Sequence, residues 1–355
     1  MRNIVAALLA ALVLPNGAAL AQGGAHEFAL TQLKPDVYLL QRPNPLRMPV
    51  EGNVVFIVNE ADVVVVDGGS LPLAAENAIK QIRSVTNKPV SVLVNTHWHG
   101  DHNFGNQVYR EQYPGVRIVS HENTWRYLAS EKNAKDIADL PGQLDANLVS
   151  LRELKASGDW NERRELLLSD VQLDRKEVTR IRATPPDLTF TDGLVLRRGA
   201  REIHIRHPGK ANTDGDVIVW LPRERIVVSG DIVVWPTPFG FGSFPREWIQ
   251  TLEVILALEY EILVPGHGDV QRNGEYLRLL QRTLASLREQ AAGAVAKGLD
   301  LEATRKVMDT SSFEREFVGE DAMKKRMFDA FWMTPIVRQA WLEASGKEIR
   351  QDELQ

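Results

Sequence analysis

The sequence predicts an α/β fold, and three observations support this prediction. Runs of β-branched residues bounded by turn residues recur between residues 37 and 94, as expected for buried strands. One helical segment separates two of these runs, and alternating strand, helix and strand is typical of layered α/β proteins. Hydrophobic residues make up 44% of the 355 residues and charged residues 25%, which suits a soluble chain with a sizeable core.

The predicted elements follow in chain order. Strands are expected at residues 37–40, 53–58 and 63–66, and a polar turn joins the last two into a hairpin. A helix is expected over residues 73–85, followed by another buried strand over residues 89–94. Together these segments predict the first sheet and a helix packed against it.

The second half of the chain changes character twice. Residues 122–180 are polar and helix-forming, with leucines spaced by three or four residues, which predicts a helical insertion over the core. Short strands then return, at residues 193–196, 202–206, 216–221, 226–228 and 262–264. From residue 274 onward apolar residues recur at helical spacing, which predicts a C-terminal helical extension.

The N-terminal residues have the three parts of a secretory signal peptide. Arg2 is positively charged, residues 4–14 form a short apolar run, and residues 19–21 form a small-residue cleavage site. This run is shorter than the ~20 residues of a membrane-spanning helix, and no later stretch is long enough. We therefore expect an exported protein, periplasmic or secreted, without stable membrane insertion.

Charge and cysteine content exclude several classes of function. The chain has 42 Lys and Arg against 47 Asp and Glu, for a net charge of -5, and it has no strongly basic stretch. We therefore expect no nucleic-acid partner. The absence of cysteine excludes disulfides, iron–sulfur clusters, cysteine zinc sites and thiol nucleophiles.

One short segment directs the functional interpretation. Three histidines and an aspartate follow the predicted strand at residues 89–94 within six residues: His97, His99, Asp101 and His102. In a loop that leaves a rigid strand, such side chains can converge on one point. Imidazole and carboxylate groups are suitable ligands for zinc and related divalent ions. With His267, half of the eight histidines would gather at this site.

This segment resembles the signature of the metallo-β-lactamase superfamily. Further segments resemble that family's landmarks in the same order: an early strand that ends in Asp67-Gly68-Gly69, the segment Asn212 to Asp216, the motif Ser229-Gly230-Asp231, and the motif Pro265-Gly266-His267-Gly268. The resemblance implies a four-layered αβ/βα sandwich with a metal site on one rim. The expected parts are a signal peptide (1–21), a metallo-β-lactamase-like domain (22–273) and a C-terminal helical extension (274–355).

The resemblance also implies two metal positions that share a bridging carboxylate. The implied ligands are His97 and His99 for the first metal, Asp101, His102 and His267 for the second, and Asp231 as the bridge. Zinc is the expected cofactor, as one or two ions, with another divalent metal as the alternative. Two cations lower the pKa of a shared water molecule. Asp101 is the expected catalytic residue, which orients this nucleophile or relays its proton.

The chain departs from the family pattern at Asn212. The segment that usually reads Gly-His-Thr reads Ala-Asn-Thr here, so an amide replaces the third imidazole of the first metal. An amide oxygen is a weaker zinc ligand. Asn212 is therefore either a ligand or a hydrogen-bond donor to the oxyanion of the substrate. His207 could replace it in principle, but its position at the end of a strand favours an ordinary role.

Residues 235–245, here called the aromatic loop, follow Asp231 and combine aromatic residues with prolines and glycines. Beside a metal rim, Trp235, Phe239 and Phe241 are candidate substrate contacts of a loop or lid. The alternative is a buried connection packed on the C-terminal helices. Trp98 is either a pocket wall or a packing residue.

These patterns predict a metal-dependent hydrolase. We expect a metal-bound hydroxide to attack an ester, lactone, thioester or β-lactam-type carbonyl of a small-molecule substrate. One alternative is an iron-dependent oxidoreductase that resembles sulfur dioxygenases. Another is a non-catalytic metal-binding protein whose site is disabled at Asn212. Metal content and turnover separate the three.

Overall fold

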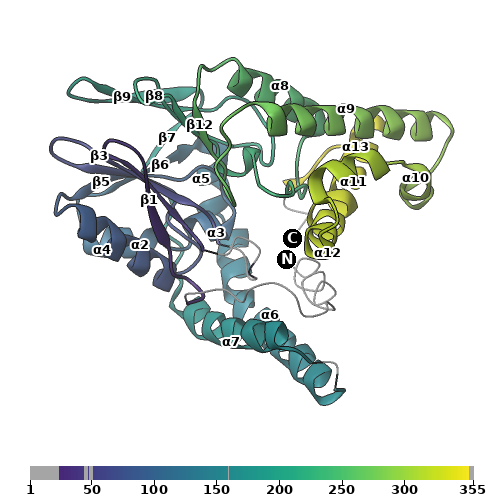
Figure 1. The fold of residues 1–355 in the computed structure, drawn as a ribbon, viewed down its shortest axis with the longest axis horizontal. Helices are drawn as coiled ribbons and strands as arrows, with labels where there is room; N and C mark the ends of the chain where they lie inside the picture. The colour runs from purple at the N-terminus through teal and green to yellow at the C-terminus, as the bar shows by residue number, and fades with distance from the viewer. Residues whose placement is uncertain (1–23, 44–46, 48–50, 159, 352–355) are drawn as a thin grey trace.

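The computed structural model describes residues 24–43, 47, 51–158 and 160–351, and its strands form two sheets (Figure 1). The seven strands of the first sheet lie in chain order: β1 (Ala29–Lys34), β2 (Val37–Gln41), β3 (Val54–Val58), β4 (Val63–Val66), β5 (Val90–Val94), β6 (Arg117–His121) and β7 (Leu188–Phe190). Neighbouring strands pair antiparallel from β1 to β4 and parallel from β4 to β7.

The second sheet has five strands in the order β12-β11-β10-β9-β8. They are β8 (Gly193–Arg198), β9 (Arg201–Arg206), β10 (Ile218–Leu221), β11 (Ile226–Val228) and β12 (Ile262–Val264). Only β11 and β12 pair parallel, and both run toward the candidate site.

Helices cover the outer faces of both sheets, while the inner faces meet in an apolar core that includes Val64 and Val219. The first sheet packs on α2 (Pro72–Val85) and α4 (Asn106–Gln112). The second sheet packs on α8 (Pro245–Leu256) and α9 (Glu275–Ala296). The predicted four-layered sandwich is therefore confirmed. Its β3 and β4 are buried on both faces, which explains their continuous β-branched runs.

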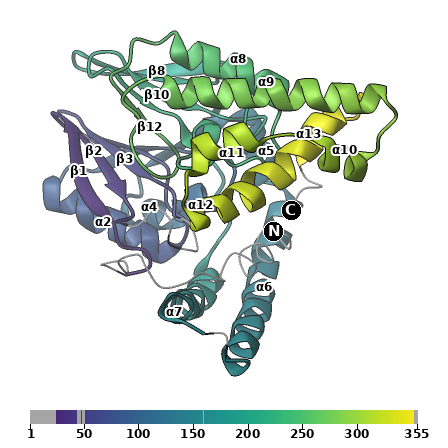
Figure 2. The same cartoon turned by 45° about the vertical axis from the view of Figure 1, so that its right-hand side comes forward.

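The helical segment that the sequence predicts after residue 122 lies between β6 and β7. It comprises α5 (Glu122–Leu128), α6 (Glu131–Ala156), α7 (Glu162–Glu177) and η1 (Val178–Arg180). Figure 2 shows α6 and α7 side by side, projecting away from the sheets. Leu148 and Leu151 are buried in a cluster with apolar residues of α7.

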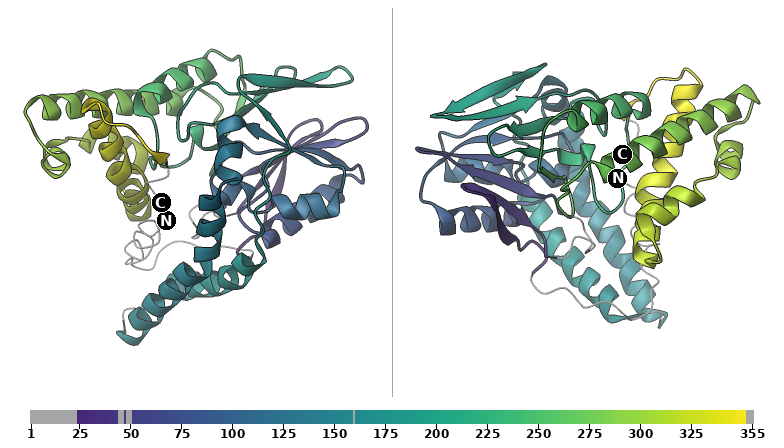
Figure 3. Two further views of the ribbon diagram at one scale, coloured as in Figure 1. Left: turned by 180° about the vertical axis from the view of Figure 1, so that it is seen from behind. Right: turned by 45° about the horizontal axis from the view of Figure 1, so that its top comes forward.

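The C-terminal part is helical, as predicted. After α9 come α10 (Leu301–Val307), α11 (Ser311–Val318), α12 (Ala322–Met327), η3 (Phe328–Met333) and α13 (Thr334–Ala344). Trp332 of η3 is fully buried and meets Trp248 of α8 edge to face, with ring centroids 5.7 Å apart. This packing holds the C-terminal helices on the second sheet's helical layer (Figure 3).

The sequence patterns did not predict β1, β6, β7 or α8. Residues 29–32 of β1 are exposed, so this edge strand has no buried apolar run, and β7 is only three residues long. The predicted signal peptide lies outside the described residues. Among the helices that the structure describes, none is long and apolar enough to cross a membrane.

A buried ionic cluster ties α7 to the segment before β3. His26 Nδ1 lies 2.8 Å from Glu51 Oε2, and His26 Nε2 lies 2.7 Å from Asp174 Oδ1. Ser70 Oγ also donates to Glu51 Oε2 at 2.6 Å. Burial opposes a charge on His26, but the hydrogen bonds to Asp174 and Glu51 outweigh it and raise the pKa of His26 to about 10. His26 is therefore a buried structural residue.

We predict that His26→Gln lowers the free energy of unfolding by about 3 kcal/mol at neutral pH, because it leaves two buried carboxylates without their cation. Because folding raises the pKa of His26, its contribution is complete below pH 6.5 and disappears as the pH rises toward 10. Urea unfolding of both proteins across this range measures the difference. The matched control is His204→Gln, at a half-buried surface site. A difference that does not shrink with rising pH would contradict the ionic account.

Candidate metal centre

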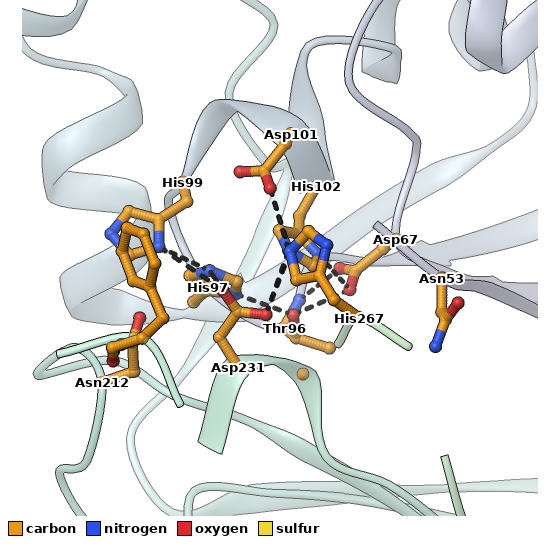
Figure 4. Close-up of polar contacts among 12 residues, drawn as sticks. Asn53, Asp67, Thr96, His97, His99, Asp101, His102, Asn212, Asp231 and His267 are labelled. Atoms are coloured by element: carbon orange, nitrogen blue, oxygen red, sulfur yellow. Dashed lines mark hydrogen bonds and ion pairs between the residues drawn. The ribbon is translucent and has the colours of Figure 1, made fainter. Parts of the chain in front are cut away.

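The side chains of the centre come from the carboxyl ends of strands in both sheets. The turn after β5 and the short helix α3 (Gly100–Asn103) carry the four residues of the histidine-rich motif. The 3-10 turn η2 (Gly230–Ile232) follows β11 and carries Asp231, and the loop after β12 carries His267. Because these strand ends meet at one rim, the motif residues converge from distant parts of the sequence (Figure 4).

The first group of side chains contains two imidazoles. His97 Nε2 lies 2.9 Å from His99 Nδ1. Asp231 Oδ2 faces both nitrogens, at 3.5 Å from His97 and 3.9 Å from His99. His97 is fully buried and His99 is partly exposed, so the group opens toward solvent on the His99 side.

The second group contains two imidazoles and a separate carboxylate. His102 Nε2 lies 3.1 Å from His267 Nε2. Asp101 Oδ2 lies 3.0 Å from His267 Nε2 and 3.7 Å from His102 Nε2. Asp231 Oδ1 faces the same two nitrogens, at 3.2 Å and 3.5 Å. The two oxygens of one buried carboxylate therefore point to two different pairs of histidines.

The donor set fits divalent cations. Asp231 Oδ1 is buried and accepts no well-aligned hydrogen bond from the described residues. In each pair of histidines the two ring nitrogens approach each other closely, at 2.9 Å and 3.1 Å. A methyl group at Gly266 would collide with Asp231 Oδ1, so this position needs a residue without a side chain. Imidazole nitrogens and carboxylate oxygens that converge in this way are the ligands that zinc prefers in proteins without cysteine.

Contacts behind the histidines fix their orientation. Because a carboxylate can only accept, His102 Nδ1 donates to Asp67 Oδ2 at 2.9 Å, and His267 Nδ1 donates to the backbone oxygen of Glu51 at 3.0 Å. Thr96 Oγ1 and the Thr96 amide hold the Asp67 carboxylate, each at 2.8 Å. Both histidines therefore present Nε2 to the centre, as is typical of metal-binding histidines.

The charges of the centre are strongly coupled. Burial and the charge of His102 lower the pKa of His97 to about 4. For His102, burial acts in the same direction, but Asp231 and Asp101 outweigh it and raise the pKa well above its usual value. Despite burial, His267 and the other imidazoles hold the pKa of Asp231 well below its usual range. Asp231 is therefore ionised at neutral pH, which is the form that binds cations.

Asn212 lies on the side of the first group (Figure 4). Its Nδ2 donates to the backbone oxygen of Phe239 at 2.6 Å, and its Oδ1 is buried without a hydrogen-bond partner among the described residues. His207, the other candidate for this position, instead contacts the Asp216 carbonyl at 2.7 Å and stacks on His121 with centroids 4.2 Å apart. The structure thus brings Asn212, and not His207, to the first group.

The aromatic loop contacts both the centre and the C-terminal helices. The ring of Phe239 meets His99 edge to face at 5.4 Å and stacks on Phe331 of η3 at 6.0 Å. Phe241 packs on Phe239 at 4.9 Å, and Trp235 lies under Lys324 of α12 at 5.3 Å. The two sequence interpretations of this loop are therefore compatible, because one face of Phe239 borders the centre while the loop packs on the helices.

Trp98 is a buried packing residue next to the centre. Its ring lies 4.4 Å from His99 and 4.1 Å from Tyr127, measured between centroids. Glu51 and Thr96 contact the histidines from behind, and neither was among the predicted site residues. Thr96 directly precedes the motif, whereas Glu51 has no local pattern that could have indicated its contact.

Among curated proteins, the chain is 22% identical over 255 residues to a linear primary-alkylsulfatase of Pseudomonas sp. (strain ATCC 19151). This match covers 67% of the chain and 46% of the relative, so the chain spans about half the length of that protein. It is also 30% identical over 91 residues to a metallo-beta-lactamase type 2 of Bacillus cereus, covering 24% of the chain and 36% of the relative.

Solved structures show the same fold at low sequence identity. An inverting sec-alkylsulfatase from Pseudomonas sp. superimposes with a TM-score of 0.63 at 15% identity, covering 89% of this chain and 50% of that chain. A metallo-beta-lactamase from Pontibacter korlensis gives a TM-score of 0.51 at 17% identity, covering 73% of this chain and 99% of that chain. The model of the metallo-beta-lactamase superfamily matches residues 47–267, more than half of the chain, and this protein therefore belongs to that superfamily.

Proposed function

We propose that this protein is a metal-dependent hydrolase of small-molecule esters or related acyl compounds. The observation that carries the proposal is the position of Asp231, whose two oxygens face the two histidine groups separately. The names of the relatives, alkylsulfatase and beta-lactamase, support hydrolysis as the reaction type. The N-terminal sequence pattern further supports export of the protein.

The proposed ligands divide into two unequal sets. In the first set, His97, His99 and Asp231 would hold one ion with help from the free Oδ1 of Asn212. In the second set, Asp101, His102 and His267 would hold the other ion, and Asp231 would be shared between the two. The facing side-chain atoms of Asp101, His102 and His267 lie within 3.7 Å of one another. Each set has two imidazoles, but the second adds the charged carboxylate of Asp101 where the first has only the neutral amide of Asn212, so zinc suits the second set better. Bound metal ions would lower the pKa of a water molecule and so provide a nucleophile at neutral pH.

Asp101 is the proposed proton acceptor. Its side chain is the most exposed carboxylate of the centre, at 26%, whereas that of Asp231 is 3% exposed. Asp101 Oδ2 lies 3.0 Å from His267 Nε2, and this contact holds the partly exposed carboxylate at the centre. A carboxylate in this position can orient the attacking water molecule and accept its proton.

The surroundings of His99 favour a substrate with an apolar part. The rings of Phe239 and Trp98 both meet the His99 ring edge to face, and His99 is itself partly exposed. We propose that Phe239 contacts the apolar part of the substrate, with Trp235 and Phe241 supporting the loop. The scissile carbonyl of an ester, lactone, thioester or β-lactam would then lie beside the two ligand sets.

A sulfate ester is the second candidate substrate. It is favoured by the alkylsulfatase sequence match, which covers more of the chain than the beta-lactamase match, 67% against 24%. Parallel assays of carboxylic esters, β-lactams and alkyl sulfates on one zinc-loaded preparation decide between these substrates. Oxygen uptake with bound iron would favour the oxidoreductase alternative. Tight ligand binding without turnover would favour the non-catalytic alternative.

We predict that His102→Ala removes about one equivalent of bound metal and lowers turnover by more than about 100-fold. The reason is that loss of even an outer partner of a ligand costs 10- to 100-fold in typical metal sites. Metal analysis and ester assays on purified variants measure both effects. The matched control, His207→Ala, removes a histidine that contacts Asp216 and His121 instead, and should keep the metal. Unchanged metal content in His102→Ala would refute the ligand assignment.

We also predict two unequal zinc affinities, with the first set the weaker, because an amide oxygen replaces an imidazole at Asn212. Asn212→His should bring the two affinities closer together. Calorimetric zinc titration of both proteins, with turnover assays beside it, tests this. Lower turnover without tighter zinc binding in the variant would instead support Asn212 as an oxyanion donor. Equal, tight binding of two zinc ions by the unaltered protein would contradict the prediction.

A further inference from the structure

The chain after α13 returns to the candidate metal centre. Gly346 has a left-handed φ of 64° directly after the helix, and the Lys347 amide donates to the Leu342 carbonyl at 2.9 Å. This arrangement ends a helix and reverses the chain, and glycine adopts it without strain. The tail then runs back toward the middle of the molecule (Figure 3). It brings Gln351, the last described residue, to the loops of the centre.

The side-chain amide of Gln351 uses its full hydrogen-bonding capacity. Oε1 accepts from Trp98 Nε1 at 3.3 Å and from the backbone N–H of Asp214 at 3.2 Å. Nε2 donates to the backbone oxygens of Gly242 at 2.9 Å and Asn212 at 3.5 Å. A glutamine amide has two acceptor lone pairs and two N–H donors, so all four are engaged.

These four partners belong to three separate loops around the first ligand set. Trp98 stands between His97 and His99 in the sequence and packs on the His99 ring. Asn212 carries the unpartnered Oδ1 beside that set. Gly242 belongs to the aromatic loop, whose Phe239 ring meets His99 edge to face. The Gln351 side chain thus connects three loops beside His99.

We propose that Gln351 is a positioning residue for substrate binding, which fixes the aromatic loop and Trp98 relative to the first ligand set. This inference rests on the proposed hydrolase function, because the aromatic loop that Gln351 positions carries Phe239, the proposed contact for the apolar part of the substrate. Gln351 contacts Asn212 at its backbone oxygen and not at the Oδ1 proposed as a ligand, so it acts through the loops and not on the reacting atoms.

The test compares three variants with the unaltered zinc-loaded protein. Gln351→Ala removes all four contacts, whereas Gln351→Glu keeps the acceptor oxygens and loses both donors. Glu348→Ala is the matched control, because Glu348 is exposed in the same tail and its carboxylate accepts a hydrogen bond from Arg350 Nε at 3.1 Å. Kinetic constants are measured with the best ester substrate, and the indole N–H resonance of Trp98 is recorded by NMR after assignment with Trp98→Phe.

We expect Gln351→Ala to raise KM by about ten-fold with kcat changed by less than about two-fold, because each net hydrogen bond is worth roughly two- to ten-fold in an equilibrium. Its Trp98 resonance should shift. Gln351→Glu should raise KM as much, since it loses the bonds to the aromatic loop, with a smaller shift of the Trp98 resonance. Glu348→Ala should match the unaltered protein in every measurement.

An unchanged KM in Gln351→Ala, with or without a lower melting temperature, would overturn the inference and show that the tail only packs. An equal fall of kcat in all three variants would also overturn it. These outcomes differ from failure of the proposed function itself, in which the unaltered zinc-loaded protein hydrolyses no ester, β-lactam or sulfate ester.

Discussion

The buried carboxylate of Asp231 determines how closely the strands of the two sheets must approach at the metal centre. A charged group that is 3% exposed is stable only where opposite charges or cations compensate it. Its compensation comes from both sheets: His97 and His102 follow β5 of the first, and His267 follows β12 of the second. The sandwich must therefore hold the ends of these strands within a few ångströms. The need for glycine at Gly266, against Asp231 Oδ1, shows how close this approach is.

Buried polar contacts also connect the histidines of the centre to residues behind them. Glu51 serves two clusters at once, because its backbone oxygen orients His267 while its carboxylate pairs with His26. His26 in turn binds Asp174 on α7, so the helical insertion is connected to the centre by buried polar contacts. Asp67 has a comparable position at the end of β4, where it orients His102. The scaffold and the centre are thus parts of one hydrogen-bonded arrangement.

Local sequence patterns predicted those features that residues close together in the sequence determine, namely the buried strands and the histidine-rich motif. Strands buried on both faces, such as β3 and β4, give continuous β-branched runs, and the histidine-rich motif is compact in sequence. An exposed edge strand such as β1 gives no such signal. The contacts of Glu51 with His267 and of Gln351 with Trp98 join residues more than 200 positions apart. Only the fold brings such residues together, so no local pattern could have predicted them.

We propose that Asp231 lies between two metal positions, with one oxygen directed to each. Anomalous diffraction at the zinc edge, from crystals of the zinc-loaded protein, would locate these positions. We expect two anomalous peaks on either side of the Asp231 carboxylate, one at His97 and His99 and the other at His102 and His267, with the first peak weaker. A single peak bound by all four histidines, or no peak beside Asp231, would contradict it.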